Sequence, residues 1–213
     1  MPGHRFDRII ATCASVSVPL AWLAQARPGG RILITLTGWQ YGFALVRVTV
    51  TGPDTAAGEF LDRPFSFMLA RAQENPRRPV RLPEIGGEPA RPARYGPGTL
   101  SSDAQDAWMH RWLAQLALPF STYYPVTDPS AITYVHDLAS DSWAWLRAAG
   151  EGGYEVGQAG PVRVWDTIER AISQWEQAGS PRQPEFTLSI TGSRQVVSHP
   201  EMTDSWLLPA GPP

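Results

Sequence analysis

The apolar positions in the first third of the chain come in short runs. Residues 6–13 are rich in isoleucine and too short for a typical helix, which indicates a buried parallel strand. Residues 18–30 repeat apolar side chains at helical spacing, with a proline in the first turn and two glycines after the last, so they predict a helix. Further strands are predicted at residues 31–38, 43–52 and 58–70.

The second half of the chain combines two helical patterns with several strand patterns. Apolar residues four apart, behind a possible capping box at residues 102–105, predict an amphipathic helix that ends before Pro119. A second helix is predicted over residues 164–178, with Gly179 as its stop. Strands are predicted at residues 120–126, 131–138, 142–148 and 154–160, and a last hairpin turns at residues 191–193.

Composition divides the chain into three parts. Residues 73–98 contain six prolines and almost no large apolar side chains, so they are predicted to be a linker. Residues 1–99 carry twelve arginines and seven acidic residues, whereas the remainder carries six arginines and thirteen acidic residues. We therefore expect an α/β unit at residues 1–72, a Pro/Arg-rich linker at 73–98 and a Trp-rich α+β unit at 99–213.

Several classes of protein are excluded as leading interpretations. Apolar residues make up 43% of the chain and charged residues 18%, and no apolar run reaches the ~18 residues of a membrane span. Residues 1–8 lack the apolar segment of a signal peptide, and the single cysteine cannot form an intrachain disulfide, so a cytoplasmic protein without membrane contact is expected. The net charge of −2 argues against a nucleic-acid partner.

The histidines form no recognisable catalytic or metal-binding motif, so no residue is assigned as catalytic and no metal is expected. His110 lies beside two tryptophans on a predicted helix and is interpreted as structural. His136 and Asp137 are adjacent in a predicted strand and point to opposite faces, which works against an acid–base pair. His4 and His199 lie near predicted chain breaks and are expected to be solvated.

The tryptophans and the linker arginines each allow two interpretations. Seven of the nine tryptophans lie between residues 108 and 206, where they could line a peptide groove but are interpreted as core. The arginines could attract an acidic peptide or a phosphate, or they could keep the linker solvated, which is the interpretation preferred here. These arginines are Arg63, Arg71, Arg77, Arg78, Arg81, Arg91 and Arg94.

The end of the first predicted strand is the most favourable place for chemistry in the front part, because ligands of parallel sheets lie at the carboxyl ends of the strands. Thr12, Cys13, Ala14 and Ser15 occupy this place and are predicted to form a substrate-facing loop. Cys13 has no base or cation nearby in sequence to activate its thiol, so it is interpreted as an inert buried thiol. The hydroxyls of Thr12 and Ser15 could orient a carboxylate or an amide without being activated.

The run FDRIIATCASVSVPLAWLAQARPGGRILITLTG resembles the second half of the methyltransferase domain of protein-L-isoaspartate O-methyltransferases. The similarity covers about residues 6–70. It implies an α/β fold, namely the carboxy-terminal part of a Rossmann-like methyltransferase sheet followed by the small α+β domain. The back segment VRVWDTIERAISQWEQAGSPRQPEFTLSITGSRQVV is similar to the extension of bacterial relatives that accompany ATP-grasp or lanthionine-forming enzymes and methylate an aspartate of a precursor peptide.

The resemblance also implies what this chain would lack. Met1 comes just before what would be the fourth strand, so the glycine-rich loop and the ribose-binding acid that hold S-adenosylmethionine in the family have no counterpart here. The complete enzyme would use this cofactor on a peptide or protein carboxylate, but no cofactor is expected for this chain alone. The missing first strand would leave the edge of residues 6–13 bare and able to self-associate, unless an upstream methyltransferase half covers it.

Three interpretations remain. The leading one is the carboxy-terminal portion of an S-adenosylmethionine-dependent aspartyl or isoaspartyl carboxyl O-methyltransferase, inactive without its amino-terminal half. The alternative is a non-catalytic subunit that recognises a peptide or a partner in ribosomal peptide modification. The third is a product without activity.

Overall fold

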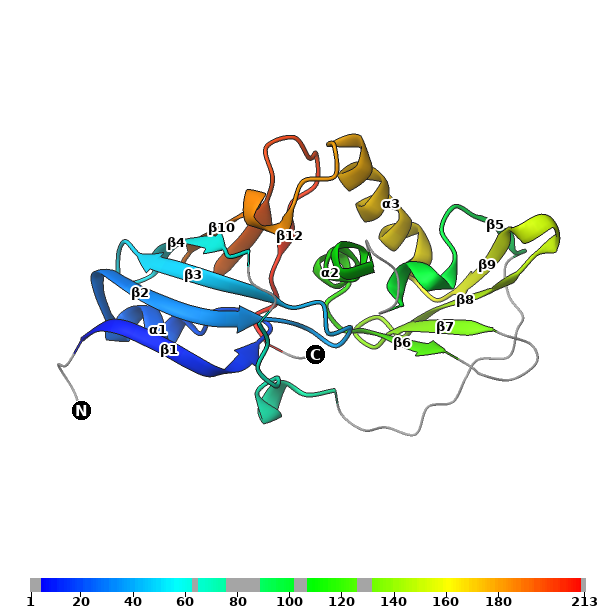
Figure 1. Cartoon of the computed structure of the whole chain (residues 1–213). Coiled ribbons are helices and arrows are strands. Elements are labelled where there is room, and N and C mark those ends of the chain that lie inside the picture. Colours follow the sequence, from blue (N-terminus) through cyan, green and yellow to red (C-terminus); the bar gives the residue numbers. More distant parts are fainter. Residues whose placement is uncertain (1–4, 63–64, 76–88, 102–106, 126–131, 212–213) are drawn as a thin grey trace.

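The computed structural model describes residues 5–62, 65–75, 89–101, 107–125 and 132–211, which form two β-sheets (Figure 1). Helices α2 (Ala107–Ala117) and α3 (Val164–Gln177) lie where the two sheets meet (Figure 1). Trp112 of α2 and Trp175 of α3 belong to the apolar core of the first sheet, while Ala114 and Trp165 of the same helices belong to the core of the second. The two helices therefore join both cores. None of the helices in the described ranges is long and apolar enough to cross a membrane.

The larger sheet has seven strands in the order β1-β2-β3-β4-β10-β11-β12. Strands β1 and β2 are parallel and are connected by the short helix α1, and the other neighbours pair in antiparallel fashion. The elements are β1 (Phe6–Ser15), α1 (Leu20–Gln25), β2 (Ala26–Leu36), β3 (Ala44–Val50), β4 (Thr55–Phe60), β10 (Thr187–Thr191), β11 (Arg194–Ser198) and β12 (Trp206–Leu207).

The smaller sheet has five antiparallel strands in the order β5-β9-β8-β7-β6. Its inner face packs against α2 and α3. The strands are β5 (Arg91–Ala93), β6 (Ser121–Pro125), β7 (Thr133–Asp137), β8 (Ser142–Ala148) and β9 (Tyr154–Ala159). Short 3₁₀ helices complete the description: η1 (Arg71–Gln73), η2 (Pro97–Leu100), η3 (Gly150–Gly152) and η4 (Gln183–Glu185).

The mixed α/β character and the strand–helix–strand start agree with the sequence, but two front elements differ. Helix α1 ends at Gln25, and residues 26–30 already belong to β2, with Gly29 in the left-handed region at a φ of 78°. The fourth strand covers Thr55–Phe60 rather than residues 58–70. The chain after Phe60 leaves the sheet and later returns to the end of β1, where Ala70 N donates to Ala14 O at 2.9 Å.

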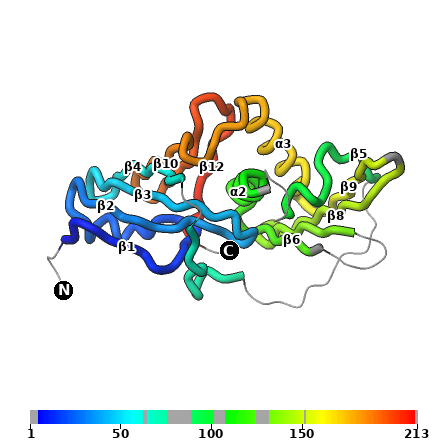
Figure 2. The backbone as a smooth tube through the Cα atoms, viewed as in Figure 1, coloured from blue at the N-terminus to red at the C-terminus, as the bar shows by residue number. Residues whose placement is uncertain are grey.

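Strand pairing crosses the boundaries that the sequence predicts between the front and the back of the chain. Strands β10, β11 and β12 come from the back of the chain and complete the front sheet, as Figure 2 shows by the opposite ends of its colour scale. Strand β5, inside the predicted linker, is a strand of the second sheet. The cause is long-range pairing, since β10 fits between β4 and β11 in a continuous register. Residues 76–88 of the predicted linker and the predicted capping box lie outside the described residues.

The back elements follow the sequence closely. Helix α3 ends at Gln177, and Gly179 takes a positive φ of 83° after it. The last hairpin turns through Gly192 as predicted. The core interpretation of the tryptophans is confirmed for five of the seven, which are buried: Trp112, Trp145, Trp165, Trp175 and Trp206.

Candidate functional site

The candidate site is the edge of the larger sheet where the parallel strands β1 and β2 end. Parallel strands open their carboxyl ends at the same edge, and the loops that follow them form the usual ligand-binding crevice of α/β sheets. Here these loops are residues 16–19 after β1 and residues 37–43 after β2. The predicted residues Thr12, Cys13, Ala14 and Ser15 lie at this edge.

These four residues are the bulged end of β1 rather than a separate loop. Ile10 lies opposite Leu33 and Ala14 opposite Thr35, so residues 11–13 of β1 face a single residue of β2. The bulge pushes Thr12 into solvent and leaves Cys13 half-buried as a free thiol, while Ala14 and Ser15 are buried. Thr12 and Cys13 are therefore the two predicted site residues that reach the surface.

Ser15 is held by an internal contact that the sequence did not reveal. Its Oγ donates to Gln73 Oε1 at 3.0 Å, and the same oxygen accepts Val16 N at 2.9 Å. The main-chain carbonyl of Gln73 accepts the indole Nε1 of Trp39 at 2.8 Å. Gln73 was assigned to the linker, and no local pattern marks it as a partner of Ser15. It thus ties the end of β1 to the loop after β2.

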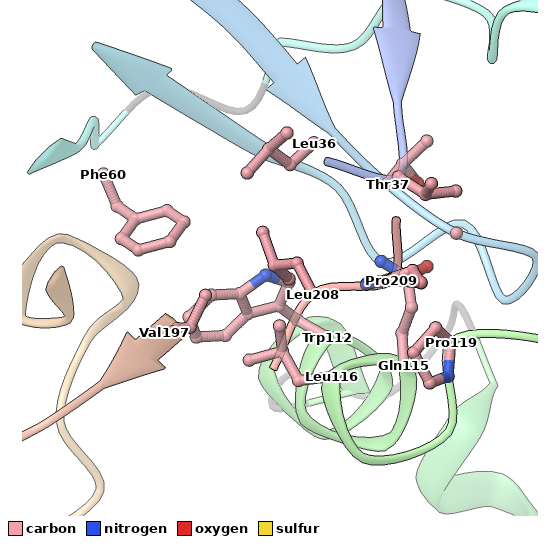
Figure 3. Close-up of a pocket in the computed structure, with 12 residues that line it drawn as sticks. Leu36, Thr37, Phe60, Trp112, Gln115, Leu116, Pro119, Val197, Leu208 and Pro209 are labelled. Carbon is pink, nitrogen blue, oxygen red and sulfur yellow. The ribbon is translucent and has the colours of Figure 1, made fainter. Parts of the chain in front are cut away.

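A small cavity lies behind this edge, between the end of β2 and helix α2 (Figure 3). Its volume is about 20 Å³, and Leu36, Phe60 and Trp112 are among the apolar residues that line it. Thr37 Oγ1 faces this region as a buried atom without a hydrogen-bond partner among the described residues. A cavity of this size admits about one water molecule, so it is too small for a cofactor or a substrate side chain.

His136 and its neighbour Asp137 each have a structural role. His136 Nε2 lies 2.9 Å from Asp141 Oδ1, and its ring stacks on Trp143, whereas Asp137 accepts Ser140 N at 3.2 Å. His136 and Asp137 therefore serve different partners, as expected for adjacent strand residues.

His199 was expected to be solvated, and this prediction is wrong. Its side chain is buried with the ring 5.1 Å from that of Phe186, because the chain after β11 folds back over the core. His110 packs against Trp175 with ring centroids 5.2 Å apart. His4 lies outside the described residues. In the described part of the chain, no three His, Cys, Asp or Glu side chains are grouped to hold a metal ion.

A charged cluster ties the end of the predicted linker to α3. Arg91 Nε donates to Asp166 at 3.1 Å, and its Nη2 donates to Glu169 at 2.6 Å. Burial alone would raise the pKa of Asp166, but hydrogen bonds from Arg91 and Gln158 outweigh burial and hold this pKa below its usual range. Arg94 pairs with Glu176 at 3.0 Å. These two linker arginines are therefore neutralised by helix carboxylates; Arg71 is exposed, and Arg63, Arg77, Arg78 and Arg81 lie outside the described residues.

Comparison with known proteins gives different results for the sequence and for the structure. No protein-family model matches the sequence, and no curated protein matches it. A solved structure described as a protein-L-isoaspartate O-methyltransferase is similar to this chain with a TM-score of 0.40 and 13% sequence identity. The similarity covers 93% of this chain and 55% of that chain, so this chain spans about half the length of that protein.

Proposed function

We propose that this chain is a portion of an S-adenosylmethionine-dependent carboxyl O-methyltransferase that acts on an aspartyl or isoaspartyl residue of a peptide or protein, and that further strands pair with β1 to complete it. The observation that carries the proposal is the outer edge of β1. Strand β1 pairs in parallel with β2 on one side, and on its other side no described strand pairs with it between Phe6 and Thr12. Phe6 is 51% exposed on this strand and Ile10 is 67% exposed.

An open parallel edge of this kind supports completion by more parallel strands. An unprotected apolar edge strand invites pairing with another strand. Strands added beside β1 would bring their own carboxyl ends next to Thr12 and Cys13. The glycine-rich turn that the sequence resemblance requires would come from these added strands, because residues 5–62 offer no such turn at the edge.

The described residues fit one wall of such a site. When bound, the cofactor supplies an electrophilic methyl group. Thr12 can donate its hydroxyl to a substrate carboxylate from the exposed bulge, and Ser15 cannot, since its hydroxyl is used by Gln73. The chain would then contribute mainly alignment of the carboxylate with the methyl group, which is the main requirement of this reaction.

The test supplies the strands that are proposed to pair with β1. The full chain is combined, fused or in trans, with a polypeptide that carries a glycine-rich loop and the proposed additional strands, and carboxyl methylation is measured as base-labile methyl ester on an aspartyl peptide. We expect methylation only in the combination, and loss of it in Ile10→Lys, which places a charge on the pairing edge. Calorimetry should find no binding of S-adenosylmethionine to the chain alone tighter than about 1 mM. Micromolar binding by the chain alone would contradict the proposal.

A non-catalytic recognition role is the second candidate. It is favoured by an open pocket that is lined by the loop after β2, helix α2 and strand β6. If the combined polypeptides bind a peptide but transfer no methyl group, this role is favoured over catalysis.

A further inference from the structure

An open pocket of about 330 Å³ lies where the loop after β2 meets the start of α2 and strand β6. Trp39 and Tyr41 come from the loop, Arg111 from α2 and Tyr123 from β6. We call it the loop–helix pocket. Its volume falls at the lower end of the range for small-ligand sites, and its mixture of aromatic rings with a single cation is typical of such sites.

Arg111 is oriented but not neutralised. Its Nε and Nη2 donate to the main-chain carbonyl of Leu100 at 3.2 and 2.9 Å, which fixes the plane of the guanidinium. Within the described ranges no carboxylate pairs with it, in contrast to Arg91 and Arg182, which both have acidic partners. A guanidinium that is held in place while its outer edge lacks an acidic partner is prepared to bind a carboxylate.

Tyr41 stands at the same pocket in an unfavourable backbone conformation. Its φ is 58°, in the left-handed region that aromatic residues rarely adopt, and its side chain is 65% exposed. Non-glycine residues in this region are strained, and such strain is concentrated at ligand sites. The backbone turn that holds Tyr41 is closed by its N–H, which donates to Gly38 O at 3.2 Å.

Trp39 provides the fixed part of the aromatic wall. Its indole is anchored to Gln73 O, and its ring packs edge-on against Phe120 with centroids 5.0 Å apart. The pocket thus brings the exposed Tyr41 and the largely buried Trp39 together with a cation. An apolar or aromatic body would pack on the rings while its negative group pairs with Arg111.

We propose that the loop–helix pocket binds a carboxylate carried on an aromatic or large apolar group, as at the carboxy-terminus of a peptide or in a free N-acyl amino acid. Thr12 and Cys13 do not line this pocket, so the proposed carboxylate ligand is treated as distinct from the methyl acceptor. Binding requires neither the cofactor nor added strands. The inference therefore stands or falls independently of methylation.

The test titrates the full chain with N-acetyl-phenylalanine, with the amide of the same compound, and with an N-acetylated tetrapeptide that ends in phenylalanine. We expect saturable binding of both acids, and at least about tenfold weaker binding of the amide, which lacks the charge that Arg111 recognises. If the tetrapeptide binds more tightly than N-acetyl-phenylalanine, the ligand is a peptide terminus. If the two acids bind equally, the pocket recognises the terminal residue alone. No saturation by either acid up to about 10 mM, or equal binding of the amide, overturns the proposal.

Two variants and a control locate the site. Arg111→Gln should weaken binding of the acids by about tenfold or more. Tyr41→Gly should weaken binding while raising the melting temperature, because glycine adopts a positive φ without strain. Arg194→Gln removes the same charge from an exposed position on β11 and should leave the affinity unchanged. Equal weakening by Arg194→Gln, or unchanged binding in Tyr41→Gly, would overturn the assignment even if Arg111→Gln failed to fold.

Discussion

Two edge strands, β1 of the larger sheet and β5 of the smaller one, differ in length and in exposed side chains. Strand β5 is three residues long, has Pro92 at its centre and is held to α3 by Arg91. Strand β1 is ten residues long and exposes Phe6 and Ile10. Short edge strands, prolines and charges are the features by which proteins prevent unwanted strand pairing. The β5 edge therefore ends its sheet, whereas the β1 edge can accept another strand.

The protection of β1 is confined to its last residues. Ala14 N donates to Met68 O at 2.8 Å and Ala14 O accepts Ala70 N, so the returning chain covers the carboxyl end of the strand. Before this point the only described ion pair on β1 is between Asp7 and Arg27 of the neighbouring strand, and both side chains are exposed. The difference between the two edges indicates that a partner would pair with residues 6–12.

The largest expected effect tests the protected edge. Arg91→Ala should lower the free energy of unfolding by about 2 kcal/mol, because Asp166 and the mostly buried Glu169 both lose a charged donor. The matched control is Arg147→Ala on β8, whose surface pair with Glu155 should contribute only about 0.5 kcal/mol. Both values can be measured by urea unfolding. Equal losses of unfolding free energy in the two variants would show that the ion pairs of Arg91 contribute no more than an ordinary surface pair and do not specially stabilise the β5 edge.

The second prediction tests the open edge. The purified chain should form dimers or larger species in light scattering, and Ile10→Lys should weaken this association by about tenfold, or about 1.4 kcal/mol. The unfolding free energy should change by less than about 0.5 kcal/mol, since Ile10 is exposed.

The matched control for the open edge is Leu207→Lys. Leu207 is 56% exposed on β12, which forms the opposite edge of the same sheet. This variant should leave the association unchanged. A monomeric wild-type chain, or equal weakening of the association by both variants, would contradict the prediction that the chain associates through the β1 edge.

Local patterns predicted the elements better than their partners. The bounds of α3 and the hairpin at Gly192 follow from helical spacing and turn chemistry within one segment. The placement of β10 against β4 depends on contacts such as Leu188 opposite Gly58, more than a hundred positions apart, which no local pattern encodes. Local patterns therefore identified the separate strands, but they could not predict that strands from the back of the chain pair with the front sheet.

The candidate site shows the same limit. The sequence placed Thr12, Cys13, Ala14 and Ser15 at the end of a parallel strand, because the strand pattern and its position in α/β sheets are general. It could not separate Thr12, which reaches solvent, from Ser15, which is held by Gln73 after the chain returns from β4. The loop–helix pocket also combines segments far apart in the chain, so only the folded structure brings Arg111 and Tyr41 to one cavity.

The smallest expected effect concerns the acid stability of the protected edge. The pKa of Asp166 is raised by burial but lowered more by Arg91 and Gln158, so the folded carboxyl binds its proton at lower pH than the unfolded one. Its contribution to stability is then present above the unfolded value of about 4 and is lost as the pH falls through the folded pKa. Asp166→Asn should therefore be less stable than wild type near neutral pH, with the difference shrinking as the pH falls below about 4. Urea unfolding across this range measures the difference, and a gap that stays constant or widens on acidification would show that the cluster at β5 does not depend on the ionised carboxylate.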